Sequence, residues 1–158
     1  MKTIIYFTAI FSLFFLFSCS DNSKESLNNE ASLPDNLLDK VSGLQVLNSS
    51  INTKKQTTAL FYGNQNTIQR IKANGNRIEK GEKMVWITWK QKSDPNWFEA
   101  LIPGKLIALE VLEFDAEKDN PEYQKFEGNP IHIKNDTLGN QHRIKILLEQ
   151  KMAIVPQL

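Results

Sequence analysis

The chain contains almost no cysteine. Cys19 is the only one among 158 residues. A disulfide within the chain is therefore excluded, and the fold must be stabilised by packing alone. The same count excludes covalent attachment of a c-type haem, because the Cys-x-x-Cys-His attachment motif needs two thiols.

Histidine is also scarce, since His132 and His142 are the only two. Their spacing does not place them one turn apart on a helix, as zinc-binding pairs often are. His132 lies between two isoleucines in an alternating run, so it points away from their shared face. His142 lies early in a predicted helix. We therefore interpret both as exposed or hydrogen-bonded side chains, and they are the only candidate ligands if a metal binds.

Neither the charge nor the motifs indicate an enzyme. The formal net charge is +1 and no basic patch is concentrated enough to predict nucleic-acid binding. A nucleophile elbow of the form Gly-x-Ser-x-Gly and a glycine-rich phosphate loop are both missing. The carboxylates of the central stretch form no pair whose spacing demands acid-base catalysis: Asp94, Glu99, Glu110, Glu113 and Asp115. No catalytic residue is predicted.

The N-terminus has the pattern of a bacterial lipoprotein signal. After Met1 and Lys2, residues 3–17 form an apolar run of about 15 residues, which suits a signal peptide and is short for a membrane span of about 20 residues. Leu16-Phe17-Ser18-Cys19 follows and resembles a lipobox, from which the bulky Phe17 departs. We predict cleavage before Cys19 and lipid modification of that residue, with several acyl chains that make anchoring stable.

The rest of the chain divides into a tether and one domain. Residues 1–18 are predicted to be the signal peptide, and residues 19–32 the lipidated cysteine and a polar, disordered tether. Residues 33–158 are predicted to be a single domain. The expected location is the bacterial cell envelope, with the protein anchored to a lipid bilayer through Cys19 and facing the periplasm or the cell surface.

Apolar periodicity predicts an α+β domain: an antiparallel β-sheet with two or three helices packed on one face. Residues 121–128 are interpreted as a helical turn or a ragged edge. The predicted helices are 34–41, a short one after the N-cap residue Asn64, and 141–151. The predicted strands are 44–51, 57–62, 84–90, 106–114 and 131–134.

The chain is organised around residues 84–110, which hold all three tryptophans. Strand alternation puts Val85, Ile87 and Trp89 on one face of the first strand, and Met84, Trp86 and Thr88 on the other. In the second strand, Ile107, Leu109 and Val111 are the inward candidates, and Ala108, Glu110, Leu112 and Phe114 share the opposite face.

Two features of this stretch are open to alternative interpretations. Trp86, Trp89 and Trp97 either line an aromatic pocket or belong to a packed core with Trp97 capping a loop. Glu110 either lies on a half-solvated face or is a buried carboxylate with a raised pKa that faces a cavity. These four residues are the pocket candidates.

The spacing of Trp89-Lys90, Asp94, Trp97, Pro103-Gly104 and Glu110 resembles the core motif of the cytochrome P-460 family. Residues 60–64 (Leu-Phe-Tyr-Gly-Asn) resemble that family's strand, which ends in a Gly-Asn step before a helix. The match covers roughly residues 43–110, with a weaker tail at 144–156. The resemblance implies a periplasmic haem-protein fold, namely an antiparallel sheet with helices, often in a homodimer.

The same resemblance implies how the chain departs from the family. Family members attach haem through a C-terminal Cys-x-x-Cys-His motif, which is missing here. The family's haem-linked lysine would fall at about Trp86, and Glu110 matches a family glutamate of the distal pocket. No cofactor is therefore predicted, and non-covalent haem binding through a histidine is the alternative.

Three functions follow from this sequence. The first is a membrane-anchored, haem-free binding or structural module that takes a small apolar ligand. The second is a non-covalent haem protein that handles hydroxylamine or nitric oxide. The third is an accessory lipoprotein that recognises a protein or glycan through exposed aromatic rings such as those of Trp97 and Phe98.

Overall fold

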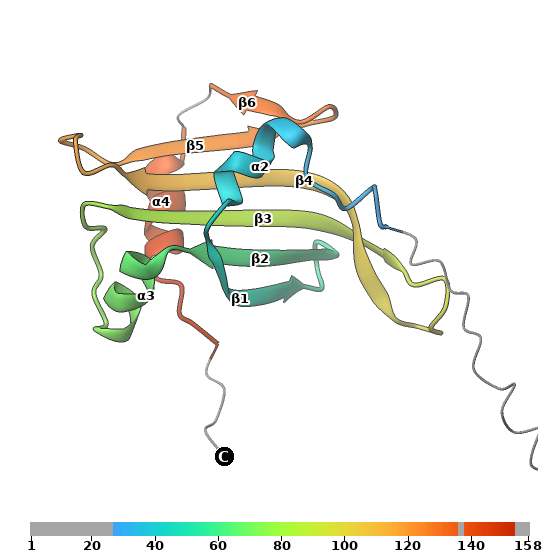
Figure 1. Cartoon of the computed structure of the whole chain (residues 1–158). Coiled ribbons are helices and arrows are strands. Elements are labelled where there is room, and N and C mark those ends of the chain that lie inside the picture. Colours follow the sequence, from blue (N-terminus) through green and yellow to red (C-terminus); the bar gives the residue numbers. More distant parts are fainter. Residues whose placement is uncertain (1–26, 136–137, 154–158) are drawn as a thin grey trace, which may run out of the picture.

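The computed structural model describes residues 27–135 and 138–153 (Figure 1). The predicted signal peptide, Cys19 and the first part of the tether lie outside these residues. Within the described part of the chain, no helix is both long and apolar enough to cross a membrane.

The described residues form one six-stranded antiparallel sheet in which each strand pairs with the next one along the chain (Figure 1). Three short helices accompany it, so the predicted α+β class with an antiparallel sheet is confirmed. The strands are β1 (Gln45–Asn52), β2 (Thr57–Gly63), β3 (Glu82–Ser93), β4 (Leu101–Phe114), β5 (Glu122–Glu127) and β6 (His132–Lys134). The helices are α2 (Asp35–Val41), α3 (Gln65–Lys72) and α4 (Asn140–Leu148).

The helices cover both faces of the sheet, which corrects the prediction that they share one face. Leu37 of α2 packs with Val85, Ile87 and Trp89 of β3 on one face. Ile68 of α3 and Leu147 of α4 pack on the opposite face, where their neighbours include Leu47, Phe61, Met84 and Leu112. The alternation of β3 follows the prediction. Because both of its faces are apolar, a second layer is needed on each side.

A β-bulge in β4 changes the predicted orientation of one side chain. Thr88 pairs with Ala108, but the next residue, Trp89, pairs with Leu106. Ile107 is therefore an extra residue, and the bulge turns it to the face of Glu110, where it lines a pocket. Leu106 takes the predicted place of Ile107 in the α2-side core. The prediction was wrong here because an inserted residue reverses the strand alternation.

Of the two interpretations of residues 121–128, the helical turn is wrong, because residues 122–127 form strand β5. Its alternation places Tyr123 and Lys125 toward the pocket and Phe126 toward the α2-side core. The backbone of this segment pairs with β4. Its polar sequence has no apolar alternation from which a strand could be predicted.

The last residues of the predicted tether contact the domain. The indole Nε1 of Trp89 donates a hydrogen bond of 2.7 Å to the carbonyl of Ala31, and the Asn28 side chain donates one of 2.7 Å to the carbonyl of Pro103. The chain therefore enters the domain beside β3 and β4.

A buried ion pair fastens α3 to β3. Arg70 Nε lies 2.8 Å from Glu82 Oε2, and both side chains are at most 2% exposed. The guanidinium also donates to the carbonyl of Gly75 at 2.9 Å, and Glu82 Oε1 accepts from the backbone of Glu79 at 2.9 Å. Both charges are thus hydrogen-bonded as well as paired, as burial requires.

Arg70→Met is expected to lower the free energy of unfolding by about 3–5 kcal/mol, because it leaves the carboxylate of Glu82 buried without a cation. The matched control is Lys145→Met, which breaks an exposed pair with Glu149 at 3.9 Å and should change stability by less than about 1 kcal/mol. Urea unfolding measures both. Equal losses in the two variants would contradict the assignment.

Candidate functional site

A hollow lies on the face of the sheet that α3 and α4 cover. We call it the sheet pocket. Its volume is about 500 Å³, within the range of small-molecule sites. All six strands contribute to it, and the start of α4 forms one wall. The lining residues are Ser50, Asn52, Lys55, Thr57, Ala59, Trp86, Thr88, Ile107, Ala108, Glu110, Tyr123, Lys125, Lys134, Leu138, Gly139, Asn140, His142 and Arg143.

Glu110 is the buried carboxylate of this pocket. The residue is 3% exposed, so the half-solvated interpretation is wrong: the carboxylate is buried and lines the sheet pocket. Arg143 of α4 binds it through two parallel hydrogen bonds, Nε to Oε1 at 2.6 Å and Nη2 to Oε2 at 2.7 Å. Tyr123 of β5 donates a third, at 2.5 Å, to Oε1. Such bidentate, charge-assisted bonds are strong and fix orientation.

The aromatic wall of the pocket lies beside this cluster. The guanidinium carbon of Arg143 is 5.6 Å from the ring centroid of Trp86, a cation–π distance. Trp86 also contacts Phe61, at 5.7 Å between ring centroids. Trp86 therefore has two packed neighbours and presents a half-buried indole to the pocket.

The contacts set the protonation of the cluster. The hydrogen bonds that Arg143 donates to Glu110 raise the pKa of Arg143, so its guanidinium stays charged. Burial, and next the hydrogen bond to Glu110, raise the pKa of Tyr123 well above its ordinary value, so the phenol stays neutral and keeps donating. At neutral pH, the charged guanidinium of Arg143 and the neutral phenol of Tyr123 therefore both donate hydrogen bonds to Glu110.

The rim of the pocket is basic. Lys55, Lys125, Lys134 and Arg143 all line it, and Glu110 is the single acidic lining residue. Glu127 offsets part of this charge, because Lys125 and Lys134 both contact it. Their hydrogen bonds lower the pKa of Glu127. The excess of cations favours a ligand with a negative group.

The structure separates the three tryptophans that the sequence grouped as pocket candidates. Trp86 lines the sheet pocket. Trp89 lies on the opposite face and is buried in the α2-side core. Trp97 is 72% exposed in the loop between β3 and β4. Of the four candidates, Trp86 and Glu110 are therefore brought together.

The two histidines are separated as well. His142 lies at the pocket rim on α4. His132 is exposed on the edge strand β6, where its Nδ1 lies 3.0 Å from the carbonyl of Pro130. Among the described residues, no three His, Cys, Asp or Glu side chains are grouped as metal ligands.

The lining of the sheet pocket fits only in part the haem that the family resemblance implies. The pocket offers one imidazole, His142, and a flat indole, Trp86, and its lysines could pair with propionate groups. The single cysteine, Cys19, lies outside the described residues, and thioether attachment through Cys-x-x-Cys-His needs two thiols. The residues present therefore fit a haem only if it is held without thioether bonds, with His142 as its one protein ligand.

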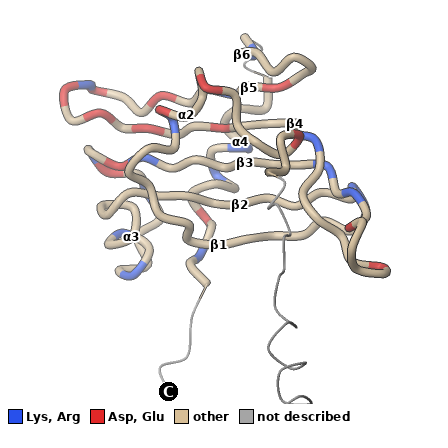
Figure 2. Tube along the Cα trace, turned by 45° about the vertical axis from the view of Figure 1, so that its right-hand side comes forward, with Lys and Arg blue, Asp and Glu red and all other residues tan. Residues whose placement is uncertain are grey.

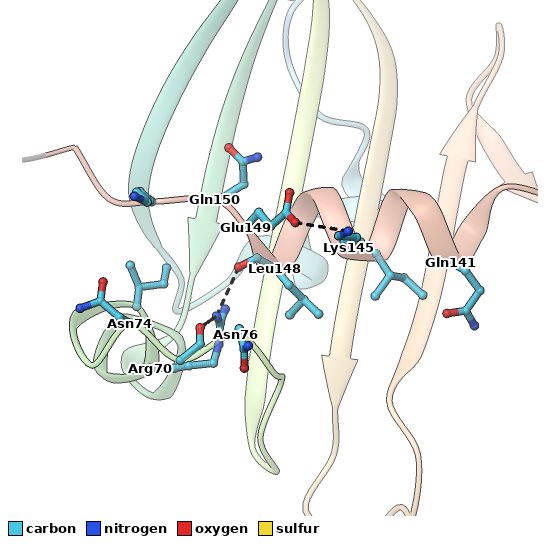
Figure 3. Close-up of a pocket in the computed structure, with 12 residues that line it drawn as sticks. Arg70, Asn74, Asn76, Gln141, Lys145, Leu148, Glu149 and Gln150 are labelled. Carbon is cyan, nitrogen blue, oxygen red and sulfur yellow. Dashed lines mark hydrogen bonds and ion pairs between the residues drawn. The ribbon is translucent and has the colours of Figure 1, made fainter.

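A second hollow of about 550 Å³ lies between α3, the loop after it and α4. Figure 3 shows Arg70 reaching across it toward the carbonyl of Leu148, at 3.5 Å. The buried guanidinium of Arg70 is paired with Glu82. The other ion pair at this hollow, Lys145 with Glu149, is exposed. This arrangement joins two helices and offers no uncommitted buried group, so the sheet pocket is the better candidate site.

No family model matches the chain, and no curated protein is significantly similar to it. The P-460 resemblance therefore stays a prediction, and the function must be argued from the site.

Two residues of the site were missed from the sequence. Arg143 lies in the predicted helix 141–151 but was not among the candidate residues, and Tyr123 lies in the segment interpreted as a helical turn or a ragged edge. The signal that was present is Glu110 itself, because a carboxylate on an apolar strand face requires a cation or several donors. Which distant residues supply them depends on where α4 and β5 pack.

Because the pKa of Tyr123 is raised in the folded protein, we expect this residue to make the free energy of unfolding fall at alkaline pH. Its folded pKa lies above the unfolded value of about 10. Its contribution is therefore complete below about pH 10 and is lost as pH rises toward the folded pKa. We expect Tyr123→Phe to remove part of the wild-type loss of unfolding free energy above pH 10, as measured by urea unfolding across pH.

Tyr62→Phe is the control, because burial alone raises the pKa of Tyr62. It should flatten the pH dependence less than Tyr123→Phe does. If the two variants have the same slope as the wild-type protein, the Tyr123–Glu110 bond does not contribute as described.

Proposed function

We propose that this chain is a lipid-anchored protein of the bacterial cell envelope whose P-460-like domain binds a small molecule without covalent haem. The observation that carries the proposal is the sheet pocket, in which the Glu110–Arg143 pair lies beside the indole of Trp86. Anchoring through acylated Cys19 and the bacterial envelope location belong to the same proposal and rest on the lipobox sequence.

The lining supports a particular class of ligand. The sequence alone favoured a small apolar molecule, but the pocket combines one flat aromatic wall with several cations. A planar apolar body suits Trp86, and a carboxylate suits the basic rim. We therefore propose a small aromatic or polycyclic acid as the ligand.

Binding of 2-naphthoate, compared with its neutral analogue 2-naphthylmethanol, tests this proposal. Calorimetric titration of the full-length protein should show saturable binding of the acid that is at least about tenfold tighter, or about 1.4 kcal/mol. Trp86→Leu should weaken binding by about tenfold, because the ring contact is lost. Trp97→Leu removes an indole outside the pocket and should leave the affinity unchanged.

Two results would contradict the proposal. One is the absence of saturable binding for both compounds. The other is equal affinity in the wild-type protein and Trp86→Leu, which would place the binding elsewhere.

The alternative function is a non-covalent haem protein handling hydroxylamine or nitric oxide, and the position of His142 at the pocket rim favours it. A hemin titration should then give a saturable Soret shift that His142→Ala abolishes. His132→Ala is the matched control, since His132 lies outside the pocket, and it should leave the shift intact. No saturable shift, or one that survives His142→Ala, would remove this alternative.

A further inference from the structure

The hairpin of β3 and β4 projects beyond the rest of the sheet. The pairing of β2 with β3 ends at Lys90, and the pairing of β5 with β4 ends at Ala108. The strands nevertheless continue to pair with each other as far as Ser93 and Leu101. Figure 1 shows this two-stranded arm extending past the neighbouring strands.

The tip of this hairpin carries large apolar side chains in full contact with solvent. Trp97 is 72% exposed, Phe98 is 94% exposed and Leu101 is 57% exposed. Both Trp97 and Phe98 therefore have the exposed rings that recognition of a partner through this tip would require. An apolar cluster of this kind on a soluble surface is usually a contact site.

The tip is an ordered turn. The backbone of Asp94 donates to the carbonyl of Ala100 at 2.9 Å, and the Asp94 carboxylate accepts from the backbone of Asn96 at 2.8 Å. The rings therefore point outward from a defined turn at the end of the arm.

The chain enters the domain at the base of the same hairpin. Besides the bond from Asn28 to Pro103, Lys92 lies 2.9 Å from Glu30, and the backbone of Leu106 donates to the carbonyl of Glu30 at 3.4 Å. Figure 1 shows this N-terminal segment, in blue, beside the part of β4 that leaves the hairpin.

The length of the preceding chain limits how far the hairpin can lie from an anchor on Cys19. Eight residues lie between Cys19 and Asn28, so the stretch from Cys19 to Asn28 spans at most about 30 Å when extended. An acylated Cys19 would therefore keep the base of the hairpin within that distance of the bilayer.

The charges behind the tip complement a membrane surface. Lys90 and Lys105 are exposed on the two strands, and Lys92 is half-exposed. Figure 2 shows basic residues, in blue, where the hairpin leaves the sheet and acidic ones, in red, toward its end. Lysines close to a bilayer are attracted to anionic headgroups. The carboxylates of Asp94 and Glu99 would limit how deeply the tip enters the bilayer.

We propose that the β3–β4 hairpin tip docks onto the bilayer that holds the acyl anchor, with Trp97 and Phe98 in the headgroup region. Tryptophan is favoured at this interface because its ring is apolar and its N–H is polar. The anchor and the tip together give the domain two membrane contacts. This inference rests on the proposed lipid anchor at Cys19 and is independent of the ligand of the sheet pocket.

The test uses the full acylated protein in anionic vesicles whose acyl chains are brominated, a quencher of nearby indoles. Trp97 should be quenched, whereas Trp86 and Trp89 lie within the domain. Total tryptophan emission should therefore fall by about one third relative to unbrominated vesicles, since the interfacial indole is one of three. Trp97→Ala should abolish that fall.

Leu38→Ala is the matched control, because Leu38 is an exposed apolar side chain on α2 and its loss should leave the quenching unchanged. Mass spectrometry of the peptide that contains Cys19 separates the two hypotheses: a missing acyl group refutes the anchor. An acylated, vesicle-bound protein without quenching overturns hairpin docking and assigns the aromatic tip to a protein or glycan partner.

Discussion

The central strands β3 and β4 are apolar on both faces, and this constraint shapes the rest of the domain. Val85 and Leu109 lie in one core, whereas Met84 and Leu112 lie in the other. A sheet of this kind is stable only when each face is covered. The short helix α2 covers one face, and α3 and α4 cover the other. Because α4 has only nine residues, it leaves part of its face open, and the sheet pocket occupies that part.

The Glu110 cluster explains why this open region is polar at its floor. A buried carboxylate on β4 cannot be left without partners, and the two that it has come from α4 and β5. The same bonds therefore position α4 over the sheet and organise the pocket wall that includes Trp86. The contacts of Glu110 with Arg143 and Tyr123 thus stabilise the fold and also shape the pocket. A ligand that approaches Trp86 therefore meets charges whose positions are already fixed.

The molecule has two distinct regions at which aromatic rings meet charge. In the sheet pocket, the indole of Trp86 contacts Phe61 and Arg143. At the hairpin tip, the rings of Trp97 and Phe98 face solvent. The first region suits a small molecule, and the second suits a flat surface close to the point where the chain enters the domain. An anchored protein with both would hold its pocket in a fixed orientation.

The sequence by itself determined the class of fold and the faces of β3, because strand alternation is a local property of the backbone. It also identified Trp86 and Glu110 as unusual residues, since an aromatic ring and a carboxylate on an apolar face each need an explanation. The bulge at Ile107, strand β5 and the placement of α2 were decided by tertiary structure, because each depends on pairing or covering by residues far along the chain. The partnership of Glu110 with Arg143, 33 residues away, belongs to the same class: local pattern shows that a partner is needed, but only packing selects it.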